Sequence, residues 1–111
     1  MNLKEIYKQA LNYSQYREKI DELLAIGKTT GLEQTDALIQ FTKLNISRMN
    51  RIDKTVTLNQ NQSTSLSSLT SKFKLLLVSD AWCGDCAQIT PLINTIASKS
   101  NSCLLYTSDA A

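Results

Sequence analysis

The spacing of apolar residues in the first half of the chain predicts amphipathic helices. Between residues 3 and 12, and again after Ser14, apolar side chains recur at intervals of three and four residues and so share one helical face. Ser14 is a suitable N-cap for the second helix, and Gly27 stands where a helix C-terminal glycine is typical. The apolar faces comprise Leu3, Ile6, Tyr7, Ala10 and Leu11 in the first helix and Tyr16, Ile20, Leu23 and Leu24 in the second.

A third helix is predicted to begin between Thr30 and Thr35 and to end near Asp53. Thr30 and Glu33 have the spacing of a capping box. The apolar residues of this helix spread over more than one face, which indicates contacts on two sides. They are Leu38, Ile39, Phe41, Leu44, Ile46, Met49 and Ile52. The helical segment either packs on its own domain or meets a partner. We favour the first, because this segment supplies most of the chain's aromatic area and a half-domain has little other core.

The second half of the chain predicts strands and helices in alternation. Residues 55–58 (Thr-Val-Thr-Leu) indicate a short strand, and the continuous apolar run within residues 73–79 indicates a strand buried on both faces, as in a parallel sheet. The polar stretch 59–71 between them is either a linker or a short surface helix. Residues 83–99 have helical periodicity, and their stripe of Ile89, Leu92, Ile93, Ile96 and Ala97 is expected to pack on the sheet.

Two cysteines stand where the last strand turns into the last helix. Cys83 and Cys86 are separated by Gly84 and Asp85, a spacing typical of a dithiol–disulfide redox centre. The positive end of the helix dipole favours a thiolate at Cys83, and thiolate is the nucleophilic form. Cys86 is then within reach to resolve a mixed disulfide.

Other uses of this cysteine pair fit the sequence less well. A structural zinc site needs four ligands, whereas the chain has no histidine and only this pair of suitably placed cysteines, so a metal would require a second chain. Two inert buried cysteines remain an alternative. The absence of histidine also excludes Ser-His-Asp and Cys-His nucleophilic chemistry.

The region around this pair resembles the thioredoxin superfamily. Trp82 precedes the first cysteine as the tryptophan of that superfamily does, and Pro91, five residues after Cys86, occupies the place where its members kink the active-site helix. This resemblance covers residues 55–102. Over most of the chain a closer likeness is to bacterial thioredoxin family proteins with a helical N-terminal extension. That likeness rests on Gly27-Lys28-Thr29-Thr30-Gly31, the run from Phe41 to Asn45, and Arg48-Met49.

The resemblance implies an α/β, thioredoxin-like fold preceded by a helical extension over residues 1–54. A crossover helix would then occupy residues 59–71. The implied activity is thiol–disulfide exchange on a protein or small-molecule disulfide, with Cys83 and Cys86 as catalytic residues and Trp82, Gly84, Asp85 and Pro91 shaping the site. It requires an external thiol reductant and no cofactor. The alternative is a thioredoxin-fold binding or scaffold module with little redox turnover.

The sequence departs from the superfamily pattern at three places. Leu77 replaces a buried aspartate that moves protons to and from the resolving thiol. Asp80 is a possible substitute, but a solvated residue at the strand end is the favoured interpretation. Asp85 replaces a frequent proline; its charge opposes thiolate formation, although we favour a role in satisfying first-turn N–H groups. Pro91 is the only proline, so the cis-proline loop is missing. The resemblance therefore implies an N-terminal half of the domain, over residues 55–102, that is inactive as a fragment.

The last nine residues, 103–111, are interpreted as a non-native tail. The DNA sequence TGT CTC TTA TAC ACA TCT GAC GCT GCC encodes them without a gap and resembles a transposase adapter used in library preparation. The alternative is a genuine strand from Cys103 to Thr107 with a short tail. Under the first interpretation Cys103 has no functional role.

Composition and charge limit the remaining functional classes. The 111 residues carry a net charge of only +2, and the basic strip on the third helix lacks interleaved aromatic residues, so a solvated face is favoured over a nucleic-acid groove. This strip consists of Lys43, Arg48, Arg51 and Lys54. No apolar run is long enough to span a membrane, and the N-terminus does not resemble a secretory signal, so we expect a cytoplasmic, reducing setting.

Overall fold

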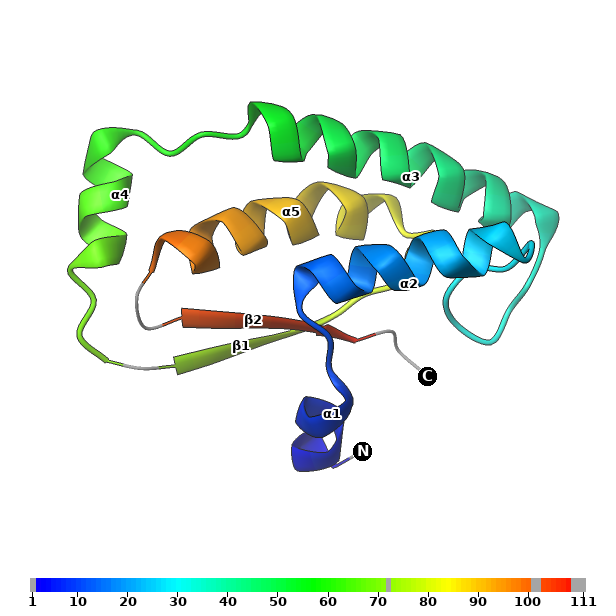
Figure 1. Ribbon diagram of the computed structural model, residues 1–111, viewed down its shortest axis with the longest axis horizontal. Helices are drawn as coiled ribbons and strands as arrows, with labels where there is room; N and C mark the ends of the chain where they lie inside the picture. The colour runs from blue at the N-terminus through cyan, green and yellow to red at the C-terminus, as the bar shows by residue number, and fades with distance from the viewer. Residues whose placement is uncertain (1, 72, 101–102, 109–111) are drawn as a thin grey trace.

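The structure is a computed structural model that describes residues 2–71, 73–100 and 103–108. Five helices and two strands follow one another along these residues (Figure 1). In order they are α1 (Leu3–Gln9), α2 (Tyr13–Ala25), α3 (Asp36–Thr55), α4 (Gln60–Ser67), β1 (Phe73–Val78), α5 (Gly84–Lys99) and β2 (Cys103–Ser108).

Strands β1 and β2 form a parallel pair, in register from Phe73 opposite Cys103 to Val78 opposite Ser108. Helix α5 connects them, because parallel neighbours require a crossover rather than a hairpin. The expected α/β class is therefore confirmed in this β1–α5–β2 unit. Figure 1 shows α5 between the sheet and α3, with α2 beside it and α4 at one end.

The main core lies where α2, α3 and the start of α5 meet. Its buried members are Tyr16, Ile20, Met49, Ala81 and Ala87. Because Tyr16 and Ile20 belong to α2 and Ala87 to α5, the helical segment packs on its own domain, as favoured from the sequence. A second cluster joins Ala97 and Ile93 of α5 to Leu75 and Leu77 of β1.

The ends of α2 are fixed by local hydrogen bonds. Its N-cap is Asn12, not the predicted Ser14, because Asn12 and Gln15 cap each other reciprocally at 2.8 and 3.0 Å. At the other end Gly27 has φ of 74°, as expected for a C-terminal glycine. The N–H groups of Gly27 and Lys28 there donate back to Leu24 and Leu23.

Helix α3 begins later and ends later than predicted. Its N-cap is Thr35, whose side chain accepts from the N–H of Leu38, so the capping box predicted at Thr30 is wrong. The helix continues to Thr55, which leaves the predicted strand at 55–58 without its first residue and without a neighbouring strand in the described sheet. Extended backbone at Val56 with no partner strand does not make a stable strand.

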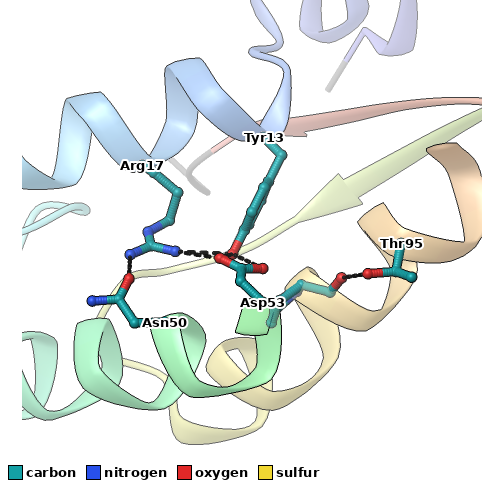
Figure 2. Close-up of polar contacts among 6 residues, drawn as sticks. Tyr13, Arg17, Asn50, Asp53 and Thr95 are labelled. Carbon is teal, nitrogen blue, oxygen red and sulfur yellow. Dashed lines mark hydrogen bonds and ion pairs between the residues drawn. The ribbon is translucent and has the colours of Figure 1, made fainter. Parts of the chain in front are cut away.

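Polar contacts hold α2 against α3 (Figure 2). The guanidinium of Arg17 donates to Asp53 at 2.9 Å and also to Asn50, and the hydroxyl of Tyr13 donates to Asp53 at 2.9 Å. Burial raises the pKa of Tyr13 to about 12. Since α3 also lies along α5, the expected contacts on two of its sides are confirmed.

The polar stretch 59–71 contains the short helix α4, which begins with a capping box between Asn59 and Gln62.

The expectation that β1 is buried on both faces is wrong. Leu75 and Leu77 pack against α5, whereas Val78, which alternates onto the opposite face, is 45% exposed. Helices cover mainly one face of this sheet (Figure 1).

The apolar stripe predicted for α5 is only partly buried. Ala97 is buried and Ile93 packs against it, but Ile89 and Leu92 are 46% and 38% exposed. The buried face instead contains Ala87, Thr90, Pro91 and Ala97, because α3 and the main core lie against the first half of the helix.

The segment interpreted as a non-native tail contributes β2. This is the conformation that the alternative interpretation predicts for Cys103 to Thr107. Pairing with β1 does not identify the origin of these residues, because any apolar, β-branched or aromatic run tends to pair with an open strand edge. The non-native tail therefore stays a prediction, and residues 109–111 lie outside the described residues.

Candidate functional site

The cysteine pair lies at the N-terminus of α5, next to the end of β1. Cys83 is the N-cap, with φ of −81° and ψ of 121°, so the helix begins one residue later than predicted. Cys86 is in the first turn, both cysteines are free, and both are half-buried. The side chain of Cys83 lies near enough to Cys86 to raise the pKa of the Cys86 thiol. Cys83 makes no side-chain capping bond, and its sulfur stands at the positive end of the helix dipole.

The environment of Cys86 favours the protonated form of its thiol. Burial raises the pKa of this thiol, and the neighbouring Cys83 adds to the rise. The backbone N–H of Asp80 and the hydroxyl of Ser79 oppose it by donating hydrogen bonds to the sulfur. The Ser79 hydroxyl is itself paired with the phenol of Tyr16 at 2.8 Å. A buried polar chain therefore extends from α2 to the second cysteine.

Two side chains from the helical segment hold the loop before Cys83. Thr30 Oγ1 accepts from the N–H of Ala81 at 2.8 Å and donates to Asp80 at 3.2 Å. Asn45 Nδ2 donates to the carbonyl of Ala81 at 2.9 Å. Thr30, Asn45 and Ala81 are all buried, so both backbone polar groups of Ala81 are satisfied by distant segments.

Trp82 and Gly84, on either side of Cys83, lie close to residues from other segments of the chain. A Cβ on Gly31, whose φ is 87°, would stand 3.5 Å from Trp82 Nε1 and 3.2 Å from an Asp80 oxygen. A Cβ on Gly84 would stand 3.3 Å from Arg48 Nη1. Gly84 thus leaves space for the Arg48 guanidinium, which donates to Asn45 Oδ1 at 3.0 Å.

A surface groove runs from Cys83 across α3. It has a volume of about 480 Å³ and is bordered by Trp82 and Asp85 on one side and by Phe41 and Arg48 on the other. We call it the Cys83 groove. Such a volume lies within the usual range for ligand sites.

The other predicted site residues have different surroundings. Asp85 is exposed and makes no side-chain hydrogen bond with any described residue, so its predicted role in satisfying first-turn N–H groups is wrong. Pro91 is buried inside α5. Leu77, in β1, packs against Ala97 of α5 and has no polar role. Asp80 acts on Cys86 through its backbone N–H.

Several residues near the site were not identified from the sequence. The charge pattern predicts a solvated strip that includes Arg48, but Arg48 is half-buried beside Gly84. The local pattern predicts a cap at Thr30 and no site role for Tyr16, Asn45 or Ser79. A signal was available, since the runs that carry the likeness to extended bacterial proteins contain Thr30, Asn45 and Arg48.

A family model described as Thioredoxin matches residues 31–106, more than half of the chain. The chain belongs to the thioredoxin family. This match begins within the helical segment and includes α3, so the helix that holds the Ala81 loop lies inside the matched region. The division of the chain at residue 54 stays a prediction. Comparisons with curated proteins and with solved structures return no significant match.

Within residues 2–71, 73–100 and 103–108, no helix has both the length and the apolar character needed to cross a bilayer. The same residues contain no group of three or more His, Cys, Asp or Glu side chains placed to hold a metal ion.

Proposed function

We propose that this protein performs thiol–disulfide exchange through Cys83 and Cys86. The observation that carries the proposal is the position of two free thiols at the N-terminus of α5, with Cys83 as the N-cap and Cys86 in the first turn. Membership of the thioredoxin family supports it. The substrate would be a protein or small-molecule disulfide, and a reducing compartment such as the cytoplasm would keep the pair as a dithiol.

In the proposed reaction, the Cys83 thiolate attacks one sulfur of the substrate disulfide. The substrate S–S bond breaks, a mixed disulfide with Cys83 forms, and the other substrate sulfur leaves as a thiolate that takes a proton from water. Cys86 then loses its proton to water and attacks the Cys83 sulfur. A Cys83–Cys86 disulfide forms, and the second substrate sulfur leaves as a thiolate that takes a proton from water. Two thiol groups of an external reductant are then oxidised to a disulfide and return two electrons and two protons to the pair.

The surroundings of Cys86 support a resolving role. Its raised pKa lowers the fraction of Cys86 thiolate near neutral pH, which makes Cys86 a poor first nucleophile and also slows the second step. The hydroxyl of Ser79 and the N–H of Asp80 stabilise the anion when it forms. Tyr16 fixes the Ser79 hydroxyl in place. Ser79 and Asp80 thus supply polar groups to Cys86, whereas Leu77 has none to offer.

The same raised pKa favours the second candidate, a binding module whose cysteines turn over slowly. The redox equilibrium distinguishes the two. Protein carrying Cys103→Ser is equilibrated with mixtures of reduced and oxidised glutathione, and the fraction of intramolecular Cys83–Cys86 disulfide is measured by mass spectrometry after alkylation. Exchange predicts a two-electron transition at a defined ratio. A pair that stays reduced, or that only accumulates glutathione adducts, supports the binding module.

A further inference from the structure

The Cys83 groove has an apolar side that lacks cover. Leu38, Phe41 and Leu44 are spaced by three residues and line it from α3. Phe41 is 52% exposed and Leu44 is 46% exposed, although both are large apolar side chains. Covering such surface is favourable by about 25 cal/mol per Å². Trp82 supplies a further aromatic surface opposite these residues, next to the Cys83 sulfur.

The groove also contains a cation whose charge has no carboxylate partner among the described residues. Arg48 donates through Nη1 to the neutral amide of Asn45, whereas the ion pair of the described helices is Arg17 with Asp53. A guanidinium presents paired donors that match a carboxylate. Asp85, on the α5 side of the groove, repels a bound carboxylate and so directs it toward Arg48.

We propose that the Cys83 groove binds the peptide segment next to a substrate's disulfide, with an apolar side chain against Phe41 and Leu44 and a carboxylate on Arg48. This inference rests on the proposed function and names its substrate class: protein disulfides flanked by an apolar and an acidic residue. Small disulfides without an apolar group would leave the α3 side of the groove uncovered.

The groove allows a binding test that does not depend on exchange. Trp82 is the only tryptophan in the chain and lies in the groove, so its fluorescence reports occupancy. The probes are two peptides whose cysteine is replaced by serine, one with flanking Leu and Glu and one with flanking Ser and Lys. We expect the Leu-Glu peptide to bind at least tenfold more tightly, and Arg48→Gln to remove most of that preference.

Matched variants separate groove contacts from general damage. Arg48→Lys should retain part of the preference for Glu, and Phe41→Ser should weaken the preference for Leu. Ile26→Ser serves as the control because Ile26 is 67% exposed and lies outside the groove. Circular dichroism melts verify that each variant is folded, and Phe41→Leu replaces Phe41→Ser if the latter is not.

The outcomes distinguish this inference from the proposed function. Equal affinity for both peptides, or an unchanged preference in Arg48→Gln, overturns the groove inference even if the protein reduces disulfides. Selective binding of the Leu-Glu peptide by protein that fails the glutathione experiment upholds the groove and contradicts exchange. Selective binding together with faster reduction of disulfides flanked by Leu and Glu upholds both.

Discussion

The phenol oxygen of Tyr16 lies 2.8 Å from the hydroxyl oxygen of Ser79, and both side chains are almost fully buried. Tyr16 belongs to α2 and Ser79 directly follows β1, so this hydrogen bond joins the helical segment to the loop that carries the cysteines. It also fixes the hydroxyl that contacts Cys86. The helical segment therefore contributes to the polar surroundings of the site as well as to the core.

Replacing Tyr16 with phenylalanine should lower the free energy of unfolding by about 1–2 kcal/mol, because the buried Tyr16–Ser79 hydrogen bond is lost. Urea unfolding measures this change. Tyr7→Phe is the matched control, since the Tyr7 hydroxyl donates to Lys74 at 3.3 Å in an exposed position and its loss should cost less than about 0.5 kcal/mol. Equal costs for the two variants would show that the Tyr16–Ser79 bond is not specially stabilising.

Thr30→Val should lower the free energy of unfolding by about 1–3 kcal/mol. The substitution keeps the shape of the side chain but leaves the buried N–H of Ala81 without its acceptor. Thr30→Ser retains the oxygen and should recover most of the loss. Amide hydrogen exchange at Ala81 gives a local measurement. Unchanged protection of this amide in Thr30→Val would contradict the assigned role of Thr30.

Gly31→Ala should cost more stability than Gly27→Ala, and the pair isolates packing from backbone strain. Both glycines have positive φ, so each alanine carries a strain of about 1–2 kcal/mol. The added Cβ at Gly27 meets nothing within 4 Å, whereas at Gly31 it meets Asp80 and Trp82. Only Gly31→Ala should therefore shift the fluorescence of Trp82. A matching shift in Gly27→Ala would mean that Gly31 is not specifically packed on the site.

The pH dependence of Cys86 follows from its raised pKa. In protein carrying Cys83→Ser and Cys103→Ser, the midpoint of iodoacetamide alkylation should lie above the free-cysteine value of about 8.5, because burial is the largest cause and remains. The folded state holds this proton more tightly than the unfolded chain does. Its contribution to stability is thus complete below the free-thiol value and is lost as pH rises through the folded-state value. A midpoint at or below that of the urea-unfolded protein would contradict this environment.

The apolar spacing and the turn residues of the sequence predicted several of the helices and strands. Spacing and turn chemistry were enough to predict three elements. These are the end of α2 at Gly27, the strand β1 and the helix that carries the cysteines. The strand at 55–58 could not be excluded, because β-branched residues satisfy a strand pattern whether or not a partner strand exists. Whether residues 55–58 pair as a strand depends on a neighbouring strand, which the local sequence does not report.

The cysteine pair could be located from sequence, but its surroundings could not. The local sequence explains each of the neighbouring polar residues without a site. It indicates a helix cap at Thr30, a helix-interior residue at Asn45 and a surface charge at Arg48. Their contacts with Asp80, Ala81 and Gly84 join segments more than thirty residues apart in the chain, and no helical or strand period reports such contacts. The burial that raises the pKa of Cys86 is likewise a property of the assembled fold.

Trapping the mixed disulfide at Cys83 tests thiol–disulfide exchange by Cys83 and Cys86 most directly. In a Cys103→Ser background, Cys86→Ser protein is mixed with a peptide disulfide and the products are identified by mass spectrometry. We predict a stable mixed disulfide at Cys83, while Cys83→Ser protein forms little adduct at Cys86 over the same time. With both cysteines present, the adduct should be transient and give the Cys83–Cys86 disulfide. Adducts that form equally fast on Cys83 and Cys86, or an adduct that the intact pair fails to resolve, would contradict exchange by this pair.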